Sequence, residues 1–109
     1  MEGKVIAIGY INTIVSRTTG SPDGIGGIKV LKKLSDAGHI ITNLESNYWR
    51  DLKGLCIAND ITFNQFLIPH AIISDKCVGC PLISNPNISD VPYVDWSEML
   101  EILKIYEIL

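Results

Sequence analysis

Cysteine, aromatic residues and long apolar runs are all scarce in this chain of 109 residues. The three cysteines are an odd and sparse set, which argues against a disulfide framework and fits a reducing cytoplasm. No apolar run approaches the ~20 residues that cross a bilayer, so we expect no membrane partner. The opening MEGKVIAIGY shows neither a basic stretch before an apolar run nor a small-residue cleavage site. We therefore expect no signal peptide and a cytoplasmic location.

Basic charge is also in short supply, because the net charge is -3. A surface that binds nucleic acid usually gathers lysine and arginine on one face. The only basic cluster here is Lys29, Lys32 and Lys33, on the polar side of a predicted helix. A solvated helix face explains this cluster, so we expect no nucleic-acid partner.

Branched aliphatic residues, in contrast, are abundant. Isoleucine, valine and leucine account for 34 residues, and isoleucine alone for 18. Such a chain can bury enough apolar surface to offset the entropy lost on ordering, which excludes intrinsic disorder. The length suits one domain, and no linker or repeat divides residues 1–109.

The first third of the chain predicts a strand followed by a helix. Residues 4–8, KVIAI, form a β-branched run that ends at Gly9 and predicts a buried strand. Ser21 resembles an N-cap, with Pro22 at the first helical position, and Gly38 resembles a left-handed C-terminal cap. Apolar residues between these caps recur at helical spacing. The stripe comprises Ile25, Ile28, Val30, Leu31, Leu34 and Ala37.

The rest of the chain continues this alternation. The further predicted elements are a strand over 39–44, a helix over 48–59, strands over 61–63 and 71–74, a loop over 79–92 and a last helix. Asp95, three residues before Glu98, resembles a capping box that opens the last helix. Strands that alternate with helices predict a three-layer, Rossmann-like α/β domain, with a mostly parallel sheet and helices on both faces.

Ligands of such folds bind outside the carboxyl ends of the strands. The loops after Ile8, Leu44 and Ser74 lie at those ends, and the loop after Leu44 is unusually polar. The candidate site is therefore expected where these three loops meet.

Those loops carry a family resemblance that covers nearly the whole chain. VIAIGYINTIV resembles the first motif of the haloacid dehalogenase-like (HAD) phosphohydrolases, an apolar strand followed by Asp-x-Asp-Gly-Thr. SPDGIGGIKVLKKLSDAGH is similar to the segment that follows it, and AIISDKCVGCPL resembles the last motif, a strand that ends in paired acids. The resemblance implies a small, capless HAD-like domain.

Carried over residue by residue, the catalytic pattern of the first motif is mostly lost. The position of the nucleophilic aspartate falls on Gly9, and that of the general acid/base aspartate on Ile11. Asn12 stands where the family has glycine, and Thr13 matches the threonine. Glycine cannot form an aspartyl-phosphate and isoleucine cannot transfer a proton, so no catalytic residue is expected at either position.

The other two motifs are also partly lost. The phosphoryl-holding Ser/Thr of the second motif falls near Glu45 or Ser46. Of the paired acids in the last motif, the first falls on Ser74 and the second is kept as Asp75, with Lys76 loosely at the basic position. Asp75 is then the one remaining family metal ligand, and a lone carboxylate binds Mg²⁺ weakly.

Two functions remain open. The favoured one is a degenerate HAD-like protein without phosphatase activity, which binds a small anion or a protein partner and needs no cofactor. The alternative is a divergent metal-dependent phosphohydrolase or phosphotransferase that uses Mg²⁺ and recruits Glu45 or Asp75. A homodimer also stays open, since small α/β domains often associate through a helix or an edge strand. The ligand-binding remnants are Asn12, Thr13, Glu45, Ser46 and Lys76.

Other candidate residues have ordinary explanations. Cys77 and Cys80 form a Cys-x-x-Cys, but Gly79 and Pro81 argue against the helix of a redox motif. A zinc site would need Cys56, His39 or His70 as further ligands, and none has paired spacing. We favour ordinary loop cysteines and a structural or surface role for His70. Trp49 is expected in the core, whereas Tyr48 and Arg50 are candidates to line the site.

Overall fold

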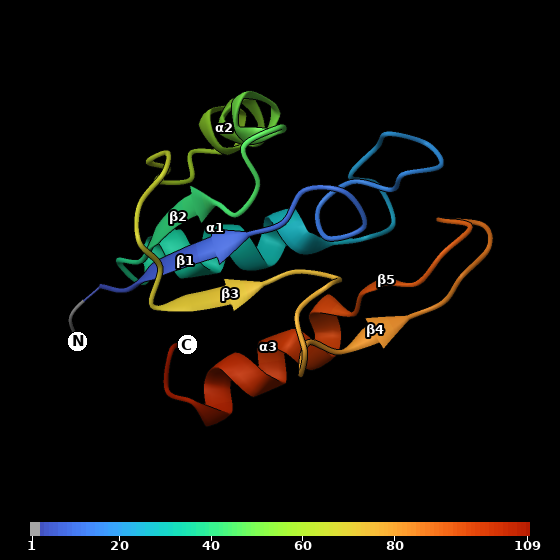
Figure 1. Ribbon diagram of the computed structural model, residues 1–109. Helices are drawn as coiled ribbons and strands as arrows, with labels where there is room; N and C mark the ends of the chain where they lie inside the picture. The colour runs from blue at the N-terminus through green and yellow to red at the C-terminus, as the bar shows by residue number, and fades with distance from the viewer. Residues whose placement is uncertain (1–2) are drawn as a thin grey trace.

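Three parallel strands form the main sheet (Figure 1). The computed structural model describes residues 3–109, so the first two residues, which enter the expectation of no signal peptide, lie outside it. The strands are β1 (Val5–Ile8), β2 (Ile40–Asn43) and β3 (Ala71–Ile73), in the order β2-β1-β3. Each predicted central strand is confirmed, with ends that differ by at most one residue.

Two shorter pairings extend this framework. Phe63 forms an isolated parallel bridge with Ile41 of β2, so the predicted strand at 61–63 is reduced to one bridge. The strands β4 (Leu82–Ile83) and β5 (Tyr93–Val94) pair antiparallel. The prediction of an uninterrupted loop over 79–92 was wrong at β4, because a two-residue strand is too short to leave a periodic pattern.

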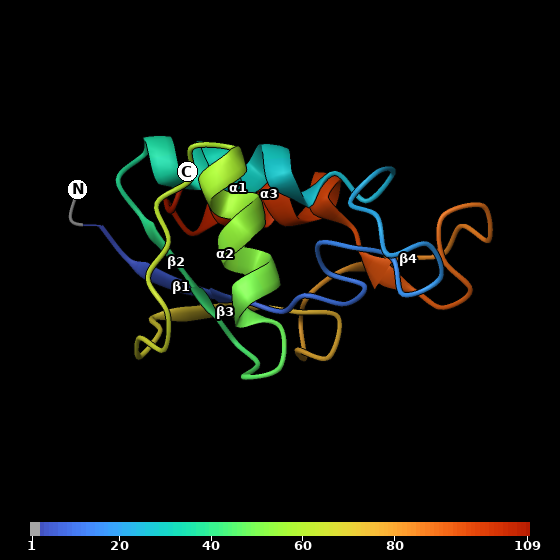
Figure 2. The ribbon, with the colours of Figure 1, turned by 90° about the horizontal axis from the view of Figure 1, so that it is seen from above.

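The three helices do not divide evenly between the two faces of the sheet. Helices α1 (Gly27–Asp36) and α3 (Trp96–Ile105) lie side by side on one face, and α2 (Trp49–Ala58) lies beyond the β2 edge (Figures 1 and 2). On the other face, the fully buried Thr42 side chain accepts a hydrogen bond from the Leu67 amide, 3.1 Å away. The structure is thus a small compact α/β domain with a three-stranded parallel sheet and three helices.

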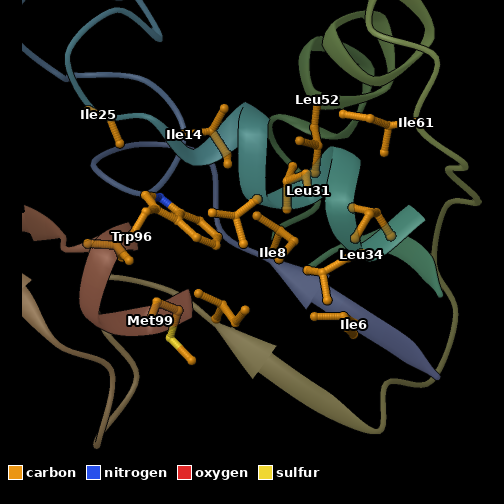
Figure 3. Packing of buried hydrophobic residues seen from close by; sticks show 14 of the residues in the cluster. Ile6, Ile8, Ile14, Ile25, Leu31, Leu34, Leu52, Ile61, Trp96 and Met99 are labelled. Atoms are coloured by element: carbon orange, nitrogen blue, oxygen red, sulfur yellow. The ribbon is translucent and has the colours of Figure 1, made fainter. Parts of the chain in front are cut away.

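The core fills the space between the sheet and the two helices that share a face (Figure 3). Ile6 and Ile8 of β1 point toward Leu31 and Leu34 of α1, and all four are at most 1% exposed. Trp96 of α3 closes the core near the carboxyl end of β1. The alternation of side chains along a strand explains why Ile6 and Ile8 share this face.

Helix α1 begins later than the sequence predicts. The expected N-cap, Ser21, instead accepts a hydrogen bond from the Asp23 amide and closes a turn. The helix starts at Gly27, and its N-cap is Gly26, which has φ 84° and no side-chain capping bond. The left-handed end at Gly38, with φ 94°, is confirmed.

Helix α3 begins where its capping chemistry indicates. The Asp95 carboxylate accepts hydrogen bonds from the amides of Ser97 and Glu98, so Asp95 is confirmed as the N-cap. The reciprocal half of the capping box does not form, because the Asp95 amide donates to the Pro81 carbonyl. None of the helices within residues 3–109 combines the length and the apolar character that a bilayer crossing requires.

Candidate functional site

A cleft of about 430 Å³ opens beside the carboxyl ends of the parallel strands. All three loops that the sequence singles out contribute to its lining, as does the segment before β5. The lining residues are Ile11, Asn12, Arg17, Glu45, Asn47, Tyr48, Asp75, Lys76 and Val91. The meeting of loops after β1, β2 and β3 follows from the parallel order of these strands, which brings their carboxyl ends to one edge.

Lack of space, and not backbone conformation, requires glycine at position 9. The φ of Gly9 lies outside the left-handed region that favours glycine. A Cβ atom at this position would lie 2.9 Å from the Ser74 hydroxyl oxygen and 3.0 Å from that of Thr13. The Gly9 amide donates to the Ile73 carbonyl at 3.0 Å, which holds the backbone against β3. An aspartate would therefore displace the two hydroxyl side chains that occupy this end of the strand.

Those hydroxyl groups contact Asp75, the acid that the sequence resemblance assigns to the last motif. One oxygen of the Asp75 carboxylate accepts long hydrogen bonds from the hydroxyl groups of Thr13 and Ser74, both at 3.4 Å. The Asp75 amide donates back to the Thr13 hydroxyl at 3.1 Å, and the Lys76 amide donates to Ser74 at 3.2 Å. Thr13 is fully buried and outside the cleft lining, so this proposed remnant positions Asp75.

Asn12 lines the cleft but also organises the loop after β1. Its φ is 56°, and its side-chain oxygen accepts hydrogen bonds from the Arg17 amide and the Ser89 hydroxyl, both at 3.1 Å. Its backbone carbonyl accepts a hydrogen bond from the Val94 amide. Asparagine tolerates the left-handed conformation better than most residues, which explains its place in this turn.

Three of the charged groups that line the cleft form no salt bridge within residues 3–109, namely Glu45, Asp75 and Lys76. Lys76 is also exposed. The Glu45 carbonyl accepts a hydrogen bond from the Asn43 side chain, which fixes the loop after β2. Ser46, the other predicted residue of this loop, is exposed and lies outside the cleft lining, so of these two residues only Glu45 lies in the cleft.

Arg17 is a cleft residue that the sequence did not identify. Its guanidinium makes two hydrogen bonds with the Asp90 carboxylate, at 3.1 and 3.0 Å. Hydrogen bonds from Arg17 and the Thr18 hydroxyl lower the pKa of Asp90 to about 2. These partners are more than 70 residues apart, and no short motif predicts such a pair.

Aromatic rings lie at and beside the cleft. Tyr48, which the sequence proposed as a lining residue, does line the cleft and stacks on Tyr10 with ring centroids 5.4 Å apart. Burial and the nearby Asp51 raise the pKa of Tyr10. Arg50 is outside the lining, and its guanidinium lies 4.7 Å from the ring centroid of Trp49. Trp49 itself is half-buried and lies outside the main core cluster, contrary to the expectation for it.

The cleft can thus offer two carboxylates, two cations and several amide groups to a ligand. Residues 3–109 contain no group of three or more His, Cys, Asp or Glu side chains arranged to hold a metal ion. No protein-family model, curated protein or solved structure matches this chain.

Proposed function

We propose that this chain is a degenerate HAD-like protein whose cleft binds a small anion without hydrolysing it. The order of the parallel strands and the meeting of their three loops support a Rossmann-like arrangement of the kind that the sequence motifs imply. The three-layer form also belongs to this proposal. It requires α2 to serve as the helical layer on the side of the sheet away from α1 and α3.

The packing at Gly9 carries the non-catalytic part of the proposal. A phosphatase of the HAD type needs a carboxylate nucleophile at this point of the first loop. Here the space beside the Gly9 Cα is taken by the hydroxyl groups of Ser74 and Thr13. Ile11, at the position of the general acid, lines the cleft with a side chain that cannot move a proton. The absence of an aspartate at position 9 thus agrees with the local packing, which has no room for its side chain.

The exposed ammonium group of Lys76 carries the binding part. A free cation beside polar groups favours an anion, and a hydrogen bond to a charged partner contributes more than a neutral one. Arg17 adds a second cation to the same cleft, although its guanidinium is already paired with Asp90. We infer that Lys76 is the main anion-binding group and that Glu45 disfavours ligands with the largest negative charge.

A titration with inorganic phosphate and with a simple phosphomonoester tests this proposal. In ¹H–¹⁵N spectra, we expect saturable shifts of the amide signals from Asn12, Glu45 and Lys76. Lys76→Ala should raise the Kd about tenfold, which corresponds to about 1.4 kcal/mol. Lys104→Ala is the matched control, because Lys104 lies on α3 and pairs with Glu101. The same Kd in both variants would contradict the proposal. So would the absence of amide shifts at high ligand concentration.

A divergent metal-dependent phosphohydrolase or phosphotransferase is the second candidate, because Glu45 and Asp75 line one cleft. Mg²⁺ uses one or two carboxylates together with water, so such a pair is a minimal requirement. We expect no Mg²⁺-dependent hydrolysis of a generic phosphate ester. Turnover that survives repurification and disappears in Asp75→Asn would establish this second function and reject the first. A matched Asp60→Asn variant, on the exposed turn after α2, controls for the loss of one charge.

A further inference from the structure

The segment between β3 and β4 holds two cysteines at the ends of one tight turn. The Cys80 amide donates to the Cys77 carbonyl at 3.2 Å, and Gly79 has φ 92°. A four-residue turn of this kind brings the Cα atoms of its first and last residues within about 7 Å. The Cα atoms of a disulfide are usually about 4.4–6.8 Å apart, so the turn holds the two cysteines at a separation that a disulfide can span.

The two thiols also point to the same place. The Cys77 sulfur lies 3.7 Å, and the Cys80 sulfur 3.8 Å, from the carbonyl oxygen of Ile72 in β3. Strand β3 is the edge strand of the sheet, so the turn folds back along this edge. Two side chains that converge on one acceptor lie on the same side of their turn, which is the arrangement that bond formation between them requires.

The third cysteine lies in a different environment. Cys56 is fully buried on α2, and burial raises the pKa of its thiol to about 12. Cys77 and Cys80 are both partly exposed. Burial is the main cause that raises the pKa of the Cys80 thiol, and a hydrogen bond with Cys77 raises it further. Cys56 is inert because the thiolate is the reactive form, so Cys77 and Cys80 are the two thiols that can react.

We propose that Cys77 and Cys80 form a reversible intramolecular disulfide by exchange with a low-molecular-weight disulfide such as oxidised glutathione. The thiolate of one of these two cysteines attacks one sulfur of the oxidant, which forms a mixed disulfide and releases one thiolate. The thiolate of the other cysteine then attacks the protein sulfur of the mixed disulfide and expels the second small thiol. In total the two protein thiols lose two electrons and two protons, and one disulfide becomes two small thiols.

The turn differs from the helical setting of strongly oxidising Cys-x-x-Cys pairs. No helix begins at Cys77, so no helix dipole stabilises its thiolate. A dithiol without that stabilisation gives a disulfide that forms readily and is a weak oxidant. The pair directly follows two cleft residues, Asp75 and Lys76, and the Cys77 amide donates to the Ser74 carbonyl. Oxidation would thus close a covalent ring immediately beside the cleft, although the proposal does not depend on what the cleft binds.

Thiol trapping in glutathione buffers tests this proposal on the folded, full chain. The reduced protein is equilibrated at a series of ratios of reduced to oxidised glutathione and quenched with an alkylating reagent. Mass spectrometry then measures the mass of the alkylated protein. We expect two of the three thiols to become protected together as the oxidised form increases, with a mass that fits one internal disulfide. Digestion should place the bond between Cys77 and Cys80.

Single variants distinguish this result from general oxidation. Cys56→Ser should leave the disulfide and its midpoint unchanged. Cys77→Ser and Cys80→Ser should each abolish it. Three thiols that stay open to the alkylating reagent at every ratio would overturn the proposal. So would a bond that includes Cys56, or crosslinked dimers that increase with protein concentration while the internal bond does not form.

Discussion

The starts of α1 and α3 differ in what fixes them. Both helices have ten residues and share one face of the sheet. Helix α3 begins at an aspartate whose carboxylate caps two backbone amides. Helix α1 begins after a glycine without any side-chain cap, six residues beyond the serine that resembles one. Local capping chemistry is thus sufficient to place one helix, whereas packing against distant residues places the other.

The two starts meet at a single contact. The Trp96 indole, at the first residue of α3, lies against Gly27, the first residue of α1. A Cβ atom at Gly27 would lie 2.6 Å from the indole nitrogen and 2.9 Å from the Ile14 side chain. The same nitrogen donates a buried hydrogen bond to the Thr13 carbonyl at 2.7 Å. Trp96 therefore connects the loop after β1 to both helix starts.

Removal of this connection should have the largest effect. We expect Trp96→Ala to lower the free energy of unfolding by about 3–5 kcal/mol, because a large buried side chain leaves a cavity. The Thr13 carbonyl would also lose its buried donor. Chemical denaturation followed by circular dichroism measures the change. The other tryptophan, Trp49, is half-buried, and Trp49→Ala should lower the same quantity by about 1 kcal/mol. Equal losses would mean that Trp96 has no special role.

A glycine-to-alanine pair tests whether packing fixes the α1 start. Gly27→Ala should destabilise the protein by about 1–3 kcal/mol, since the added methyl group overlaps the indole and Ile14. Gly54 in the exposed part of α2 has open space around its Cα, so Gly54→Ala should stabilise by about 1 kcal/mol. In a Trp96→Ala background, the penalty of Gly27→Ala should become smaller, because only the overlap with Ile14 remains. An unchanged penalty there would show that the indole does not set the position.

Removal of the α3 cap should have the smallest effect of the three. Asp95→Ala deletes the acceptor for the amides of Ser97 and Glu98, and we expect a loss of about 1 kcal/mol. Asp95→Asn is the matched variant, because asparagine keeps a capping oxygen without the charge and should retain most of the stability. If both variants lost the same stability, the charge near the helix N-terminus would be the main contribution instead of the hydrogen bonds.

The candidate site divides in a similar way. The sequence could place Asp75, Glu45 and Asn12 in one cleft, because parallel strands bring their carboxyl ends together. It could not find Arg17, whose partner Asp90 is 73 residues away. The sequence also could not show that Thr13 is buried and contacts Asp75 instead of facing the cleft. Those distinctions depend on side-chain directions that only packing defines.

The sequence by itself determined where the three strands lie, the end of α1 at Gly38 and the cap of α3 at Asp95, because each rests on neighbours within a few residues. Only the tertiary structure decided where α1 begins, since Gly27 packs against Trp96, a tryptophan 69 residues away. It also decided that a loop, through Leu67, covers Thr42 on the second face of the sheet. Local sequence patterns indicate backbone preferences, whereas the steric fit between distant segments cannot be predicted from either segment alone.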